Sequence, residues 1–225
     1  MHHSEMEAQV EFPSLPVGVT LLAMEGRTTG ALQSLVLDHL LLEDGAAVWV
    51  DARNNAVTTT LARIAPSRRI LDRIQVARGF TAYQHHAIIE DLDEALTPDT
   101  SLLVFPEVDW FYTRDEIGDG EGEAMLTGVL NEVGTVAAEN DFAAVVTRHQ
   151  EFGVSSQVES AVDERIDCTA TSFGPRFSGS DFETLVYDCG ATVQTTLAFW
   201  RRVLEARHPE TMADQPTEVT ALGSN

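Results

Sequence analysis

Short apolar runs alternate along the chain with longer segments in which apolar residues recur at helical spacing. The runs predict strands at five places, 17–24, 46–51, 74–78, 101–105 and 142–147. The longer segments predict helices between them, at 29–42, 54–64, 84–96 and 124–139. Strands that alternate with helices form right-handed crossovers, so this order predicts a three-layer α/β domain with a mainly parallel central sheet and helices on both faces.

The last third of the chain has a different pattern. Two apolar stretches predict a pair of strands at 165–172 and 181–188. The glycine-containing segment between them, 173–180, predicts a turn. An amphipathic stretch at 195–207 then predicts a last helix.

The polar ends of the chain set the predicted domain limits. We expect a polar N-terminal arm at 1–14, a single domain at 15–207 and a disordered tail at 208–225. With 225 residues, of which 44% are hydrophobic, the chain can bury one sizeable core. No apolar run is long enough for a bilayer and the N-terminus does not read as a signal peptide, so we expect a cytoplasmic protein without membrane contact.

The charge of the chain is strongly one-sided. Asp and Glu number 36, against 14 basic residues that are all arginine, for a net charge of −22. An acidic surface without lysine resembles proteins of salt-loving archaea, whose cytoplasm contains molar KCl. Because each phosphate contact loses about 0.9 logarithmic units of affinity per tenfold rise in salt, we expect weak or no direct binding of nucleic acid.

The turn after the first apolar run has the form of a phosphate-binding loop. It consists of Gly26, Arg27, Thr28, Thr29 and Gly30. A working loop reads G-x-x-x-x-G-K-[ST], in which backbone amides, the lysine and the hydroxyl hold phosphates and Mg²⁺. With Gly30 as the second glycine, the remaining positions fall on Glu25, Ala31 and Leu32, so the frame is kept and the chemistry is lost. The alternative interpretation is the first strand and helix of an ordinary α/β domain.

Five later segments, taken in order, resemble motifs of the RecA/RadA recombinase superfamily, which includes the KaiC-like ATPases. The segments are 48–53 (VWVDAR), 73–81 (RIQVARGFT), 102–107 (LLVFPE), 117–121 (IGDGE) and 145–150 (VVTRHQ). They are similar, in this order, to the family's second strand, its VARAYN stretch, its Walker B strand, its IGRGEL loop and its VVTNQ stretch. The resemblance covers roughly residues 15–190 and implies a RecA-like domain.

Position by position, the resemblance implies that the catalytic groups of this family are missing. The glutamate that activates water falls on Arg53, the Walker B aspartate on Pro106 and the DNA-contacting arginine on Asp119. Phosphoryl transfer relies on such groups for positioning and charge stabilisation. The resemblance therefore implies a non-catalytic protein without a nucleotide or metal cofactor, with an accessory or regulatory role in DNA recombination and repair.

A few residues could restore part of the missing chemistry. Arg27 could bind phosphate, since arginine is a good phosphate ligand, and residual ATP binding is therefore a third hypothesis. Glu107 and Asp109 could hold a metal, or be solvated loop acids. The histidines at 85–86 and His149 could act as acids or bases because histidine titrates near neutrality, or serve only in packing.

The predicted last helix carries a group of residues typical of protein interfaces. It consists of Phe199, Trp200, Arg201 and Arg202. Aromatic and arginine side chains are enriched in binding hot spots, so these four residues are the predicted partner surface, and a core helix with a basic outer edge is the alternative. The expected partner is another RecA-family protein or a regulatory protein. The competing hypothesis is a KaiC-like regulatory or signalling scaffold unrelated to DNA.

Overall fold

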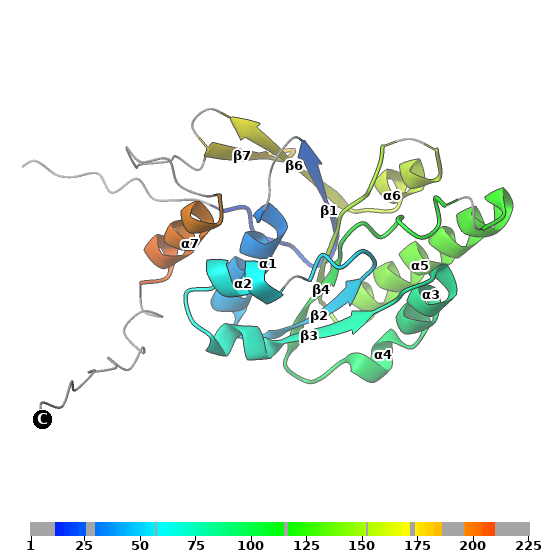
Figure 1. Ribbon diagram of the computed structural model, residues 1–225, viewed down its shortest axis with the longest axis horizontal. Helices are drawn as coiled ribbons and strands as arrows, with labels where there is room; N and C mark the ends of the chain where they lie inside the picture. Colours follow the sequence, from blue (N-terminus) through cyan, green and yellow to red (C-terminus); the bar gives the residue numbers. More distant parts are fainter. Residues whose placement is uncertain are drawn as a thin grey trace, which may run out of the picture.

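Strands and helices alternate along the first two thirds of the chain in the computed structural model (Figure 1). The structure describes residues 12–25, 30–56, 58–114, 117–151, 153–171, 174–185 and 196–209. The strands are β1 (Gly18–Glu25), β2 (Ala46–Asp51), β3 (Ile74–Arg78), β4 (Thr100–Phe105), β5 (Ala143–Val146), β6 (Glu164–Thr171), β7 (Gly174–Ser178) and β8 (Glu183–Leu185). The helices are α1 (Ala31–Glu43), α2 (Thr58–Ile64), α3 (Ala82–Glu90), α4 (Leu92–Ala95), α5 (Asp119–Glu139), α6 (Ser156–Ser160) and α7 (Thr196–Arg207), with short 3-10 helices η1 (Arg69–Arg73) and η2 (Gly153–Ser155).

The described strands form one eight-stranded sheet in the order β3-β2-β4-β5-β1-β6-β7-β8. Neighbours from β3 to β6 pair in parallel, whereas β7 and β8 are added antiparallel. The first strand lies inside the sheet, where Gly18 pairs with Ala143 of β5 and Thr20 pairs with Glu164 of β6. The predicted α/β class with a mainly parallel sheet is confirmed.

The sheet separates two hydrophobic layers. Along β2, Ala47 and Trp49 face the layer that contains α1, α2 and α7, whereas Val48 and Val50 face the layer of α3, α4, α5 and α6. Successive side chains of a strand point to opposite faces, so a strand covered on both sides needs an unbroken apolar run. The fold is therefore the three-layer arrangement, with helices on both faces, that is expected of a RecA-like domain.

Two segments differ from the sequence prediction. The segment 173–180, predicted as a turn, contains β7, because Phe177 is buried in the core and pairs with Cys168 of β6. The helix predicted at 124–139 already begins at Asp119, since acidic side chains near a helix N-terminus are stabilised by the helix dipole.

With 21 residues, α5 is the longest of the described helices, and neither it nor another described helix is both long and apolar enough to cross a membrane.

The folded region extends beyond the predicted domain limits at both ends. Phe12, which the sequence places in a polar arm, is buried. His208, which the sequence places in a tail, is also buried, and its Nε2 lies 2.7 Å from Oδ1 of Asp38 on α1. The rest of the predicted arm and tail, 1–11 and 210–225, lies outside the described residues.

Candidate functional site

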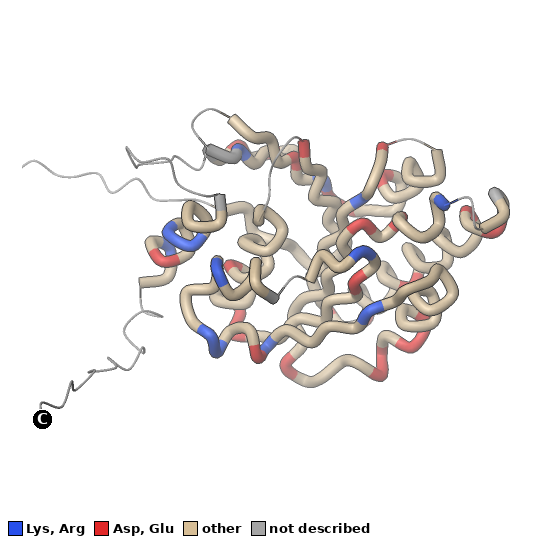
Figure 2. The backbone as a smooth tube through the Cα atoms, in the orientation of Figure 1, with Lys and Arg blue, Asp and Glu red and all other residues tan. Residues whose placement is uncertain are grey.

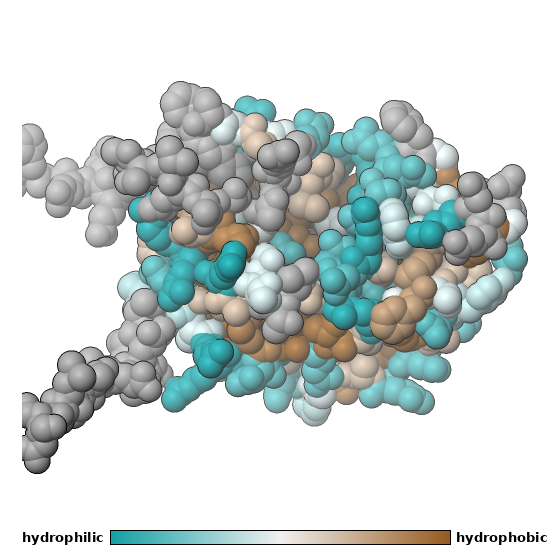
Figure 3. All heavy atoms as spheres, viewed as in Figure 1, coloured by the Kyte–Doolittle hydropathy of each residue, from teal (hydrophilic) through white to brown (hydrophobic). Residues whose placement is uncertain are grey.

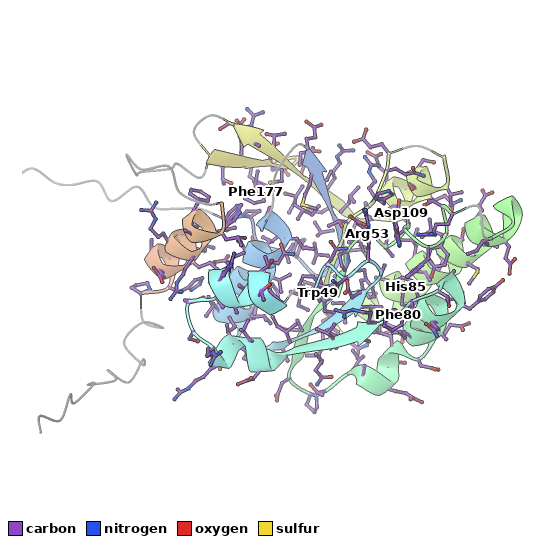
Figure 4. The ribbon with its side chains drawn as sticks, in the orientation of Figure 1. Trp49, Arg53, Phe80, His85, Asp109 and Phe177 are labelled. Atoms are coloured by element: carbon purple, nitrogen blue, oxygen red, sulfur yellow. The ribbon has the colours of Figure 1, made fainter. Side chains whose placement is uncertain are left out.

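Polar side chains gather at the carboxyl ends of the parallel strands, the edge at which α/β sheets bind ligands. Asp51 ends β2 and Arg53 follows it, Glu107 and Asp109 follow β4, and His149 follows β5. Figure 4 shows Arg53 and Asp109 at the same end of the sheet. The candidate site is therefore assembled from strand ends that are far apart in the sequence.

Arg53 is the centre of the first group of contacts. Its Nη1 donates to Oε2 of Glu107 at 3.2 Å and lies 3.3 Å from Nδ1 of His149. Because a guanidinium group can only donate, Nδ1 is the acceptor in this contact. The guanidinium carbon also lies 4.0 Å from the centre of the Trp110 ring, which His149 meets edge-on at 4.5 Å. Arg53 is thus bound by an acid, an imidazole and an aromatic face of its own chain.

The backbone at Glu107 is held in an unusual conformation. Its φ of 46° lies in the left-handed region, which non-glycine residues seldom occupy. The amide of Glu107 donates to Oγ1 of Thr147 at 2.8 Å, and the amide of Val108 donates to the carbonyl oxygen of Thr147 at 2.9 Å. The neighbouring strand β5 therefore fixes the turn after β4, and this turn positions Glu107 beside Arg53.

Asp109 is a fully buried carboxylate with three donors. It accepts hydrogen bonds from the amide of His149 at 2.6 Å, from the amide of Gln150 at 3.4 Å and from the hydroxyl of Ser155. These contacts tie the turn after β4 to the segment after β5. Among the described residues, no three His, Cys, Asp or Glu side chains are arranged to hold a metal ion.

Asp51 is likewise buried and used inside the fold. Its Oδ2 accepts from Nε of Arg78 at 2.9 Å, and its Oδ1 accepts from the amide of Asn55 at 2.7 Å. The two contacts join the end of β2 to the end of β3 and to the loop before α2. Both carboxylate oxygens therefore have a partner from the same chain.

Two residues of the site were not predicted. Arg78 is the last residue of the predicted strand 74–78. If that strand is paired with the predicted strand 46–51, Arg78 lies next to Asp51, so the positions of the two strands could have revealed this contact. For Trp110, which stacks on Arg53, the spacing of residues contains no such signal. Its position depends on the turn after β4, which is specific to the folded chain.

Helix α7 lies over the point at which the predicted phosphate loop joins α1. Gly26, Arg27, Thr28 and Thr29 lie outside the described residues. Gly30 is buried and precedes α1 with a left-handed φ of 93°. A Cβ atom at Gly30 would lie 2.7 Å from Cδ1 of Trp200 and 3.1 Å from Cδ1 of Ile64, so only glycine fits. Trp200 therefore occupies space beside the start of α1, where helix amides bind phosphate in working loops.

The predicted partner surface on α7 divides into a buried and a more exposed part. Phe199 and Trp200 are only 8% and 1% exposed, which corrects their expected place on a surface. The reason is that α7 must bury an apolar face to cover α1 and α2. Arg201 pairs with Glu205 at 2.8 Å and Arg202 is exposed, so the alternative interpretation, a core helix with a basic outer edge, describes α7.

Asp119, the position that corresponds to the family's DNA-contacting arginine, lies at the start of α5. Asp115 and Glu116 are outside the described residues, and Asp119 begins the helix. Glu121 accepts a hydrogen bond from the hydroxyl of Tyr83 at 2.8 Å, and this bond raises the pKa of Tyr83. Weak binding of DNA stays a prediction.

His85 is a buried histidine outside the carboxyl edge. Its Nδ1 lies 2.8 Å from the hydroxyl of Tyr112. Burial lowers the pKa of His85 to about 4, with a further contribution from His86. A neutral ring in this position favours a packing role over acid–base chemistry near neutral pH.

We expect His85 to make the fold sensitive to acid. The unfolded chain binds a proton on this ring below its ordinary pKa of about 6.5, whereas the folded chain does so only near pH 4, so stability falls as the pH drops through this window. Between pH 7 and pH 5 the loss is about 2 kcal/mol. Urea unfolding at constant KCl should show this loss, and His85→Phe should lack that part of it. An identical pH dependence in both proteins would contradict the assignment.

A search against models of protein families finds no match to this chain. A search of curated proteins finds no match either. The resemblance to RecA-like ATPases therefore depends on the order of the sequence motifs.

Proposed function

We propose that this chain is a non-catalytic, RecA-like protein that has lost the chemistry of its ATPase relatives and acts through contacts with other proteins. The observation that carries the proposal is the internal pairing at the carboxyl edge. Asp51 and Asp109 are buried acceptors, and Arg53 contacts Glu107 and stacks on Trp110. A nucleotide or its Mg²⁺ would have to displace these contacts, at the cost of leaving buried polar groups unpaired.

Two further features support the proposal. Trp200 lies against Gly30, beside the start of α1. The order of the family-like motifs supports an accessory role in recombination and repair, with another RecA-family protein as the partner.

The purified protein is expected to show no melting shift with Mg-ATP and no release of phosphate in molar KCl. Binding to the native state must stabilise it, by about 2.7 kcal/mol when the ligand is in hundredfold excess over Kd. Differential scanning fluorimetry and a phosphate assay measure the two quantities. A melting shift in the wild type that disappears in Arg27→Ala would sink the proposal and support residual ATP binding.

A further inference from the structure

A cavity of about 290 Å³ lies at the amino ends of the parallel strands, on the edge of the sheet opposite to the candidate site. It is lined by the last turns of α1, the start of β4, the segment between α5 and β5 and the residues before β1. Helices that connect parallel strands return the chain to this edge, so the four segments meet there although they are far apart in the sequence. The volume of this amino-edge cavity is close to the lower limit for ligand pockets, so it suits a small molecule or a single side chain.

The charged groups of this lining are acidic, and it contains no arginine. Glu43 and Asp141 contribute carboxylates, and neither has an arginine partner among the residues that the structure describes. Arg73 lies outside the lining, where it binds the carboxylate of Asp44 and two backbone carbonyl oxygens at the end of α1. Burial lowers the pKa of His39, against the smaller effects of a backbone hydrogen bond and of Glu43, so this ring adds no positive charge at neutral pH. The lining therefore favours a cation.

The C-terminus of α5 adds to the negative charge of the lining. The helix ends at Glu139, and its C-cap, Asn140, is one of the lining residues. The last turn of α5 contains no basic residue, whereas Arg73 already lies at the end of α1. A cation near a helix C-terminus is stabilised by the helix dipole, which places a partial negative charge there. Acidic positions occur throughout the molecule in Figure 2, so charge alone does not mark a site, and the enclosure of this lining distinguishes it.

Apolar side chains and unpaired polar atoms complete the lining. Leu15, Val17 and Phe142 form an apolar wall, and Val17 is one of the six large apolar side chains that are exposed among the described residues. On the face drawn in Figure 3, apolar areas are bordered by hydrophilic side chains in the same way. Within the described part of the chain, Nε2 of His39 and Oγ of Ser101 have no hydrogen-bond partner, although buried polar atoms normally have one. Side-chain rotations of the kind that accompany binding can bring these two atoms to a ligand.

We propose that the amino-edge cavity binds an alkylammonium group, whose ammonium is bound by Glu43 and Asp141 and whose alkyl stem lies against the apolar wall. An ammonium group has three donors, which suit two carboxylates and a neutral acceptor. A bare metal ion fits less well, because the described residues include no group of three His, Cys, Asp or Glu side chains that could hold one. The chain has no lysine, so the ligand is a free amine or a lysine side chain of another protein. The inference does not depend on the proposed loss of ATPase chemistry.

The test is an NMR titration of the isotope-labelled chain with n-butylamine in molar KCl at neutral pH. The backbone amide signals of Ser101 and Phe142 should shift and saturate, with a Kd of about 1 mM. Methylamine lacks the stem and n-butanol lacks the charge, so each should bind about tenfold more weakly. Nα-acetyl-lysine methylamide separates the two sources of the ligand. Affinity equal to that of n-butylamine assigns the cavity to a lysine of a partner, whereas binding of n-butylamine alone assigns it to a free amine.

The double variant Glu43→Gln, Asp141→Asn removes both charges and keeps the shapes of the side chains. It should bind n-butylamine about tenfold more weakly, because hydrogen bonds to charged groups are the stronger ones. Asparagine accepts the left-handed backbone of Asp141, whose φ is 56°, so the variant should fold. The matched control is Glu123→Gln, Glu151→Gln, which removes two exposed charges at the opposite edge of the sheet and should leave the affinity unchanged.

Three results would overturn the proposal. Equal affinity of the wild type and the double variant would place the amine elsewhere. Equal affinity for n-butylamine and for either methylamine or n-butanol would exclude a site that uses both the charge and the stem. Absence of saturable binding to the wild type would show that the cavity holds only water. None of these readouts involves ATP, so they fail or succeed separately from the ATP test.

Discussion

Trp200→Ala is expected to lower the free energy of unfolding by about 3–5 kcal/mol, the largest loss that we expect from one substitution in this chain. Trp200 is 1% exposed, and its ring lies 5.6 Å from that of Phe12, 6.0 Å from Phe177 and 5.2 Å from Phe199. Truncation would leave a cavity among these rings and beside Gly30, which has no side chain to fill it. Urea unfolding in molar KCl, followed by far-UV circular dichroism, measures the loss.

The matched control for this variant is Phe80→Ala. Phe80 is 73% exposed, so its truncation should change the free energy of unfolding by less than about 0.5 kcal/mol. Trp200→Phe keeps an aromatic ring and should cost about 1–2 kcal/mol. If Trp200→Ala were as mild as Phe80→Ala, α7 would not belong to the folded core, and its position over the start of α1 would be refuted.

Asp109→Ala is expected to cost about 3 kcal/mol of stability. The substitution leaves the amides of His149 and Gln150 and the hydroxyl of Ser155 without their buried acceptor. Each unsatisfied buried group costs about 1–3 kcal/mol, and entry of water recovers part of the sum. The loss should appear in urea unfolding as a lower midpoint with an unchanged slope.

Two companion variants separate this structural role from metal binding. Asp109→Asn keeps one acceptor oxygen, so we expect it to cost about 1 kcal/mol. Glu107→Gln removes only a partly exposed ion pair with Arg53 and should cost less than about 1 kcal/mol. If Mg²⁺ raised the melting temperature of the wild type and not of Asp109→Asn, Asp109 would be a metal ligand and the structural assignment would fail.

Parallel strands were the most predictable part of this fold. The predicted limits 46–51 and 74–78 agree with β2 and β3, because the first of these strands is buried on both faces and both end at polar or glycine residues. By contrast, β7 was predicted as a turn. Its segment is short and contains Gly174 and Pro175, and it becomes a strand because burial of Phe177 outweighs the weak local preference.

The sequence could predict where the side chains of the candidate site lie, but not which side chains contact each other. Arg53, Glu107 and Asp109 follow predicted strands, and parallel strands bring such positions to one edge. The contacts between acidic and basic side chains depend on the strand order and on the left-handed turn at Glu107. Neither of these can be deduced from the spacing of residues in the sequence. The burial of Trp200 was missed for a similar reason, since a helix with aromatic and arginine residues can serve equally as a core element or as an interface.

The central place of β1 has a consequence for synthesis of the chain. Gly18 leaves the ribosome early, yet its partner Ala143 follows only after most of the chain has been made. At about 5–20 residues per second, this delay lasts roughly ten seconds, during which an apolar strand has no neighbour in its own sheet. Distant pairing of this kind also slows folding once the chain is complete. The nascent chain is therefore expected to depend on chaperones that shield its first strand until β5 and β6 emerge.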